Sequence, residues 1–216
     1  MKDLLNISLP LTGSRLYHCF INFLEPILLI HVLTQLGLTQ NYIQDQYAIL
    51  SGYVVSLLVT PTFFCTIIYR LYLPIATDDL YYHKSTAFLH LLYALLICLL
   101  IGFPFTLIFY FFPKQSLMVL YNTTSGYQQL KYMAFPFLLF YLQTPLSTIL
   151  QAKNKNKVMF IISIIECTLE IILTYTLSHY LYVNAILISL FTGLITTLTL
   201  SAVYCFKIII KDTSLS

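Results

Sequence analysis

The sequence predicts an all-α, polytopic membrane protein with six transmembrane helices. Composition is the first reason, because 59% of the 216 residues are hydrophobic and only 9% are charged. An ordinary globular domain carries about 25% charged residues, so this chain cannot cover a soluble surface. The second reason is that its apolar residues form six long segments, at approximately 7–36, 47–73, 86–112, 128–151, 157–180 and 183–209. We therefore expect residues 1–216 to form a single membrane domain.

The length of the apolar segments favours helices over strands. A membrane-spanning helix needs about 20 apolar residues, whereas a barrel strand needs about 9–11 residues that alternate in polarity. The six segments are longer than barrel strands and do not alternate. The polar stretch at 152–157 and the short gap near residue 182 then connect antiparallel neighbours.

The positions of lysine and arginine predict the orientation. Assigning the ends and loops to alternate sides gives eight basic residues on one side: Lys2, Arg70, Lys84, Lys153, Lys155, Lys157, Lys207 and Lys211. The other side receives only Lys114 and Lys131. Because cytoplasmic loops carry the excess of basic residues, we expect a multi-pass plasma-membrane protein with both termini in the cytoplasm.

Several functional classes find no support in the sequence. The net charge of +3 is too small to indicate a nucleic-acid partner. All five cysteines lie in apolar stretches without metal-ligand or CxxC spacing, which favours packing over a metal or redox role. No GxSxG, Walker or HExxH motif is present. We expect neither a cofactor nor enzymatic activity.

The first segment, 7–36, carries a polar stripe. At 100° per residue, five side chains fall on one face of the helix: Ser8, Arg15, His18, Asn22 and Glu25. Arg15 and Glu25 are about 15 Å apart along the axis, too far to neutralise each other. Because an ionisable side chain at membrane depth costs at least ~2.5 kcal/mol, two interpretations stay open. One is a structural ion pair with another helix, and the other is the wall of a hydrophilic cavity.

Small residues recur every four positions in two other segments. The second segment has Gly52, Ser56 and Thr60, and the sixth has Ser189, Gly193, Thr197 and Ser201. Such faces let helices approach closely, so we expect packing here rather than chemistry.

The fourth and fifth segments carry the remaining polar candidates. In the fourth, Gln143, Ser147 and Gln151 share a face, and we expect Pro136 and Pro145 to interrupt the helix. In the fifth, Glu166 and Glu170 lie one turn apart with Ser163 and Thr174. Two adjacent carboxylates repel each other, so they require a nearby cation or a bound proton. A brace to Arg15 and a proton or Na⁺ coupling site both fit this pattern.

Four motifs resemble a known transporter family. They are LPLTGSRL at 9–16, RLYLPIATDD at 70–79, LYNTTSGYQQL at 120–130 and PLSTILQAKNKNK at 145–157. In order and spacing they resemble the C-terminal half of the stage V sporulation protein B family. That family belongs with the polysaccharide-biosynthesis flippases and MurJ-type lipid II flippases of the multidrug/oligosaccharidyl-lipid/polysaccharide exporter superfamily.

The resemblance implies one lobe of a MATE-like, MurJ-like transporter. In that fold two lobes face each other across a cation-rich cavity and alternate access to it. By this likeness Arg15 would line the cavity and attract the pyrophosphate of a lipid-linked saccharide, and Arg70 is a second candidate. The sequence starts where the second lobe would begin, so we expect a truncated or split half-transporter that needs a first lobe or a second copy.

The sequence thus predicts a flippase-like half-transporter for lipid-linked oligosaccharide or peptidoglycan precursors, in spore-cortex or cell-envelope polysaccharide synthesis. The expected substrate-cavity residues are Arg15, His18, Asn22, Glu25, Arg70, Gln143 and Ser147, with ion coupling at Glu166 and Glu170. Two alternatives stay open: a non-transporting membrane scaffold subunit, and a proton- or Na⁺-coupled drug antiporter of the same superfamily.

Overall fold

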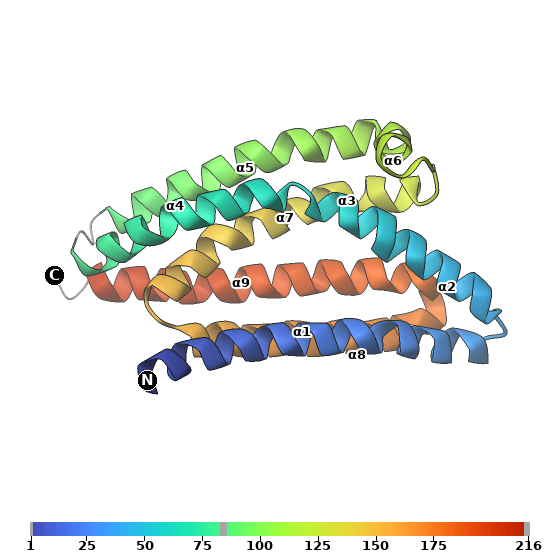
Figure 1. Ribbon diagram of the computed structural model, residues 1–216, viewed down its shortest axis with the longest axis horizontal. Coiled ribbons are helices and arrows are strands. Elements are labelled where there is room, and N and C mark those ends of the chain that lie inside the picture. The colour runs from blue at the N-terminus through green and yellow to red at the C-terminus, as the bar shows by residue number, and fades with distance from the viewer. Residues whose placement is uncertain (1, 83–85, 214–216) are drawn as a thin grey trace.

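The computed structural model describes residues 2–82 and 86–213, and every regular element within these ranges is a helix (Figure 1). In chain order they are α1 (Lys2–Gln35), α2 (Gln40–Ala48), the π-helix η1 (Ile49–Val55), α3 (Ser56–Val59), α4 (Thr62–Tyr81), α5 (Ala87–Phe111), α6 (Pro113–Tyr121), α7 (Tyr127–Ala152), α8 (Asn156–Leu181), the 3₁₀ turn η2 (Tyr182–Asn184) and α9 (Ala185–Thr213). The all-α prediction is confirmed.

The helices differ from the expected segments mainly before α4. The residues at 37–46, between the first two predicted segments, are helical from Gln40 onward, and the helix continues through η1 into α3. The break comes at Pro61, between α3 and α4. Pro136 and Pro145, expected to interrupt the fourth segment, lie instead inside an unbroken α7. Neighbouring helices can hold a proline-containing membrane helix together in this way, and Pro145 is buried.

The long helices pack in a chain of neighbours. Figure 1 shows α1 and α8 side by side along one edge, α9 beside them, and α4 and α5 along the opposite edge. Helix α7 crosses between these groups and packs against α4, α5 and α9. The open side of α1 therefore faces away from α8 and towards the crossing α7.

Tyr141 of α7 anchors the core between α4, α5 and α7. Its side chain is 1% exposed, and its hydroxyl donates a hydrogen bond to the carbonyl of Leu58, 2.8 Å away, next to the break at Pro61. Gly102 of α5 faces the ring: a Cβ there would lie 2.3 Å from the Tyr141 Cδ2 atom. The contact requires glycine at 102 because any larger residue collides with the ring.

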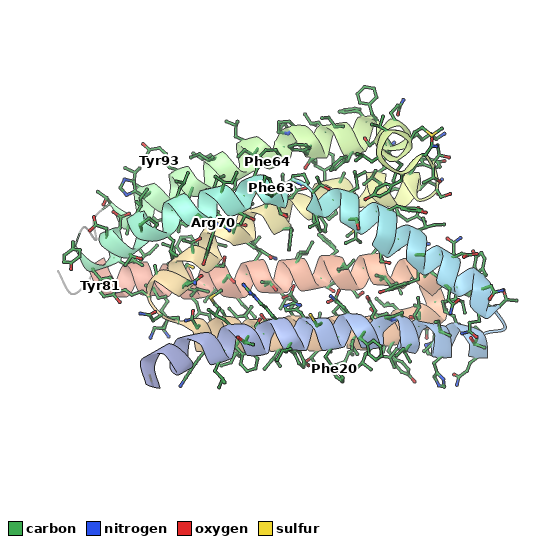
Figure 2. The ribbon with its side chains drawn as sticks, viewed as in Figure 1. Phe20, Phe63, Phe64, Arg70, Tyr81 and Tyr93 are labelled. Atoms are coloured by element: carbon green, nitrogen blue, oxygen red, sulfur yellow. The ribbon has the colours of Figure 1, made fainter. Side chains whose placement is uncertain are left out.

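Large apolar side chains cover the outside of the bundle. Figure 2 shows the aromatic residues Phe20, Phe63, Phe64, Tyr81 and Tyr93 on α1, α4 and α5, and each is more than 40% exposed. A soluble monomer rarely exposes so much contiguous apolar surface, whereas lipid accommodates it at no cost. This is a membrane protein.

The described chain holds four helical segments that are long and apolar enough to cross a membrane. They are Leu9–Gln35, Ala87–Phe111, Tyr127–Ala152 and Asn156–Ile209, with a fifth if the pair Gln40–Val59 and Thr62–Tyr81, bent by 43°, counts as one span. The segment Asn156–Ile209 contains both α8 and α9. A multi-pass helical membrane protein is thus confirmed, and the number of six spans stays a prediction.

Of the residues used to predict orientation, Lys84 and the side chains of Lys2 and Lys211 lie outside the described part.

The turn between α4 and α5 is closed by a buried carboxylate. Asp79 is 3% exposed, and its two oxygens contact the Thr86 hydroxyl at 2.9 Å and the His90 Nδ1 atom at 2.7 Å. We expect Asp79→Ala to lower the free energy of unfolding by about 1–3 kcal/mol, because it removes a buried acceptor that serves two side chains. Thermal unfolding in detergent measures this. Asp45→Ala, at an exposed position on α2, is the control, and an equal loss in both variants would contradict a specific role for Asp79.

Candidate functional site

Helix α1 is fixed to α8 through small and polar side chains. The Ser14 hydroxyl donates to the Ser163 hydroxyl at 2.8 Å, and Tyr17 and Thr168 share a hydrogen bond of 3.0 Å. Gly13 permits the close approach, since a Cβ at this position would lie 3.2 Å from the Phe160 ring. These contacts set the rotation of α1 and thereby decide which side chains point towards α7.

A cavity of about 700 Å³ lies where α1, α7, α8 and α9 meet. Its size falls within the range typical of ligand pockets. Five of the nine predicted site residues line it: Arg15, His18, Gln143, Ser147 and Glu166. They come from α1 and from the consecutive helices α7 and α8, which are far from α1 in the sequence. Arg15 and His18 of the α1 stripe therefore face this cavity.

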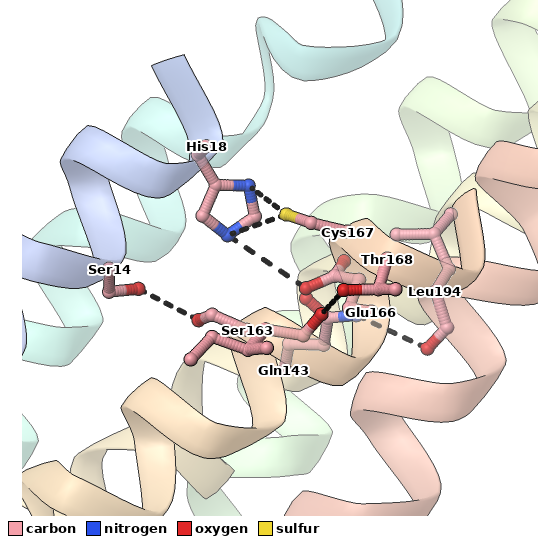
Figure 3. Close-up of polar contacts among 9 residues, drawn as sticks. Ser14, His18, Gln143, Ser163, Glu166, Cys167, Thr168 and Leu194 are labelled. Atoms are coloured by element: carbon pink, nitrogen blue, oxygen red, sulfur yellow. Dashed lines mark hydrogen bonds and ion pairs between the residues drawn. The ribbon is translucent and has the colours of Figure 1, made fainter. Parts of the chain in front are cut away.

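His18 connects α1 to the acidic side of the cavity (Figure 3). Its Nδ1 atom lies 3.1 Å from the Cys167 sulfur, and its Nε2 atom lies 3.9 Å from a Glu166 carboxylate oxygen. Across the cavity the Gln143 amide donates to the Leu194 carbonyl of α9 at 3.3 Å, as Figure 3 also shows. Cys167 is buried and contributes its sulfur to this network.

Arg15 does not form the predicted brace. Within the part of the chain that the structure describes, its guanidinium makes no hydrogen bond or ion pair, and the side chain is exposed towards the cavity. The residue that faces Glu166 is instead His18, one helical turn farther along α1. The brace was predicted from charge alone, but the rotation of α1 on α8 brings the imidazole closest to the carboxylate. The charge of Arg15 therefore has no ion-pair partner among the described residues.

The remaining predicted residues lie outside the cavity lining. Glu25, about 15 Å farther along α1 than Arg15, accepts a hydrogen bond of 3.4 Å from the Tyr47 hydroxyl near the end of α2. Asn22 is exposed on α1, and Glu170 lies one turn beyond Glu166 on α8. Arg70, which Figure 2 labels, is exposed on α4. The side chain of Ser8 is outside the described residues.

The small-residue face of α9 packs on α8 within the same chain. The Thr174 hydroxyl of α8 donates to Ser189 at 2.7 Å, and both side chains are buried. A Cβ at Gly193 would lie 3.5 Å from the Cγ atom of Glu166, an ordinary contact distance, so the two helices lie close together here. The packing interpretation is confirmed for Ser189 and Gly193 of this face. In the second segment, Gly52 has no atom within 4 Å of a Cβ built on it, so that face is open.

Sequence reasoning missed several residues of the cavity. Cys19 and Thr144 line it, as do Thr197 and Ser201 of the α9 packing face. The four-residue spacing on α9 predicted that these residues share a face. It did not predict that one part of this face packs on α8 and the other part lines the cavity. Among the described residues, no group of three or more His, Cys, Asp or Glu side chains is arranged to hold a metal ion.

The fold and the cavity together define a helical membrane protein whose bundle contains hydrogen-bonding groups and a cation, Arg15, that forms no ion pair with the described residues. The chain is 31% identical over 153 residues, 70% of its length, to stage V sporulation protein B of Bacillus subtilis (strain 168). It is 37% identical over 62 residues, 29% of its length, to sporulation protein YkvU of the same organism. The predicted family is confirmed: the chain belongs to the family of stage V sporulation protein B.

The matches cover only part of each relative. They span 30% of stage V sporulation protein B and 14% of YkvU. No protein-family profile matches the chain, and no solved structure matches it.

Proposed function

We propose that this chain is one lobe of a flippase-like transporter for lipid-linked oligosaccharide or peptidoglycan precursors. The observation that carries the proposal is the uncommitted guanidinium of Arg15 in a cavity of about 700 Å³ within the apolar span Leu9–Gln35. A cation at this depth is costly unless it has a partner. An anionic substrate supplies that partner.

The groups around Arg15 suit a pyrophosphate. A guanidinium binds phosphate oxygens with two parallel N–H bonds. On the facing helix α7, the Gln143 amide has a second hydrogen besides the one it donates to the Leu194 carbonyl. The Ser147 hydroxyl, which donates to the Thr144 carbonyl, can turn towards a bound phosphate. A lipid-linked saccharide joins a pyrophosphate to an apolar chain, so it also suits the apolar outer surface of the bundle. The similarity to stage V sporulation protein B supports a role in sporulation, and the choice of a polysaccharide precursor of the spore cortex or cell envelope rests on the resemblance of the four motifs.

The open side of the cavity calls for a second lobe. Arg15 is exposed, and lipid cannot solvate it at this depth. A separate first lobe or a second copy of the chain would enclose the site in a MATE-like arrangement. α8 has 26 residues and α9 has 29, and each exceeds the length needed for one span, which favours six crossings of the plasma membrane. Six crossings leave both termini on one side, and the distribution of lysine and arginine favours the cytoplasmic side.

Glu166 provides a means of coupling transport to an ion gradient. Its carboxylate shares the cavity with Arg15 and would repel an anionic substrate. A proton or Na⁺ bound there removes the repulsion, so binding of the ion and of the substrate favour each other. Glu170, one turn away, adds to the negative potential along the same helix.

A translocation assay tests the proposal. The chain is expressed, alone and with a first lobe, in cells that lack the full-length homologue, and outward movement of a fluorescent lipid-pyrophosphate saccharide is followed in vesicles. We expect movement when both lobes are present. The proposal would be overturned if movement were restored neither by the chain alone nor by the chain together with a first lobe. Equal movement of an uncharged lipid-linked dye would also overturn it.

Glu166→Gln separates ion coupling from substrate binding. The variant keeps the size of the side chain but removes its titratable charge. We expect substrate binding to persist and the dependence of transport on an imposed proton or Na⁺ gradient to disappear. Glu25→Gln, outside the cavity, is the matched control and should keep the gradient dependence. Retention of full gradient dependence in Glu166→Gln would show that Glu166 is not the coupling group.

A further inference from the structure

Two adjoining hollows lie at the end of the bundle where α2, the start of α7 and the α8–α9 turn come together, on the right in Figure 1. They have volumes of about 390 and 350 Å³ and share Gln129, Leu181 and Asn184 as lining residues. Arg15 and the last residue of α1, Gln35, are about 30 Å apart along the helix. These hollows are therefore separate from the cavity that contains Arg15.

The first hollow has the chemistry of a site for a neutral, hydroxyl-rich group. Its polar lining consists of two phenols and three carboxamides: Tyr42, Tyr182, Gln46, Gln129 and Asn184. Each carboxamide offers both donors and acceptors, as a group carrying several hydroxyls requires. None of the described residues lining either hollow is charged, so nothing there recognises a phosphate.

These polar side chains are not used by the fold. Among the described residues, Gln46, Gln129 and Asn184 make no side-chain hydrogen bond to another part of the chain. The wider structure is rich in such bonds, for example between Ser14 and Ser163. Three carboxamides that converge on one hollow without protein partners are available to a ligand.

The backbone around the first hollow is irregular. Tyr182 has φ +52°, a conformation that costs a non-glycine residue on the order of 1–3 kcal/mol and is found most often at functional sites. Ile49 and Leu50, which also line the hollow, begin the π-helix η1, and π-turns likewise concentrate at functional sites.

The second hollow is apolar. Beyond the shared residues and Gln128, its lining consists of Tyr132, Met133, Pro136, Leu187, Ile188 and Phe191. A ligand that fills both hollows must combine a neutral polar group with a hydrocarbon chain. We propose that this end of the bundle binds a glycolipid, with its uncharged saccharide between Tyr42 and Tyr182 and its chain along α7 and α9. The ligand class is consistent with the proposed function, but the site is distinct from it, and its test requires no transport.

A tryptophan reporter tests the site. The chain contains no Trp, so Tyr42→Trp places the sole indole beside the first hollow and keeps an aromatic ring there. The full chain is reconstituted in phosphatidylcholine nanodiscs, and emission is followed as monoglucosyl diacylglycerol is added. We expect a saturable change. Diacylglycerol and phosphatidylglycerol with the same chains should give none, and free glucose should require at least about tenfold more for half saturation.

Two variants in the reporter background identify the contributing groups. Gln129→Leu and Asn184→Leu should each weaken glycolipid binding at least about tenfold, while Gln115→Leu on exposed α6, which lines neither hollow, should leave it unchanged. Thermal unfolding of each variant confirms that it is folded. No saturable response, an equal response to phosphatidylglycerol or diacylglycerol, or equal binding by all three variants would overturn the proposal. Arg15→Ala leaves this binding intact if the two sites are separate, so failure here is distinguishable from failure of the transport proposal.

Discussion

Arg15→Ala should lower translocation of a lipid-pyrophosphate saccharide by about 10- to 100-fold. Hydrogen bonds to charged groups contribute about 1.5–3 kcal/mol, and each 1.4 kcal/mol corresponds to a factor of ten. Arg15 has no hydrogen bond or ion pair within the described chain, so, under the proposed function, its removal takes away a substrate contact without breaking a structural hydrogen bond. The thermal stability of the variant should therefore equal that of the wild type.

Two further variants sharpen this prediction. Arg15→Lys keeps the charge but loses the planar fork that binds two phosphate oxygens, so its transport should lie between those of wild type and Arg15→Ala. Lys157→Ala removes an exposed cation that does not line the cavity and should transport normally. Normal transport by Arg15→Ala would show that the arginine does not hold the substrate. Loss of transport together with loss of stability would show a structural role instead.

The helical period predicted that Arg15 and His18 share a face of α1, but it did not predict where along α1 the cavity lies. The two residues are one turn apart, and both face α7. Glu25 lies on the same face but about 15 Å farther along the axis, where the partner is Tyr47 rather than the cavity. Periodicity specifies the direction of a side chain around its helix. It does not specify where another helix crosses, and the crossing of α7 decides which part of the stripe is used.

The same reason explains the residues that were missed or misplaced. Thr197 and Ser201 belong to a face whose other members, Ser189 and Gly193, pack on α8. The position of each residue along α9 relative to α7 and α8 decides whether it packs against a helix or lines the cavity. Arg15 was paired with glutamate because opposite charges attract, but the local rotation of α1 on α8, set by Ser14 and Gly13, places His18 there instead.

The small-residue faces at Gly52 and on α9 have the same sequence spacing but different surroundings in the fold. Both have the four-residue spacing that permits close helix packing. Ser189 and Gly193 of the α9 face pack against α8, so that part of the face is not available to another protein. The Gly52 face is exposed. Identical patterns thus lead to different surroundings, which only the tertiary arrangement decides.

Gly102→Ala should be the most destabilising single-methyl change in the helical core. The added Cβ would lie 2.3 Å from Cδ2 and 3.0 Å from Cε2 of the Tyr141 ring. The ring is 1% exposed and is held by its hydrogen bond to the Leu58 carbonyl. Overpacking alone costs about 1–3 kcal/mol. If the ring moves away, the buried Leu58 carbonyl loses its donor, at a further ~1–3 kcal/mol.

The cysteines of the chain provide the measurement. Cys65 and Cys98 are buried in the same core cluster as Tyr141, so a thiol-reactive dye reports their exposure as the protein unfolds in detergent. Replacing the exposed Cys19 by Ser removes the reaction of the folded state. We expect a lower midpoint for Gly102→Ala. Gly52→Ala, where a Cβ meets no atom within 4 Å, should be neutral or slightly stabilising because alanine favours helix over glycine by roughly 0.5–1 kcal/mol.

A second substitution distinguishes the collision from a general intolerance of alanine in α5. Tyr141→Phe in the Gly102→Ala background keeps the ring, so the midpoint should stay low. Tyr141→Leu removes the ring edge that the new methyl group meets, and it should therefore cost less stability in the Gly102→Ala background than in the wild type. Additive effects of Gly102→Ala and Tyr141→Leu would contradict direct contact, because only residues that touch show an interaction energy of this kind. A favourable coupling would establish that the Gly102–Tyr141 contact joins α5 to α7 and keeps the Tyr141 hydroxyl on the carbonyl beside the Pro61 break.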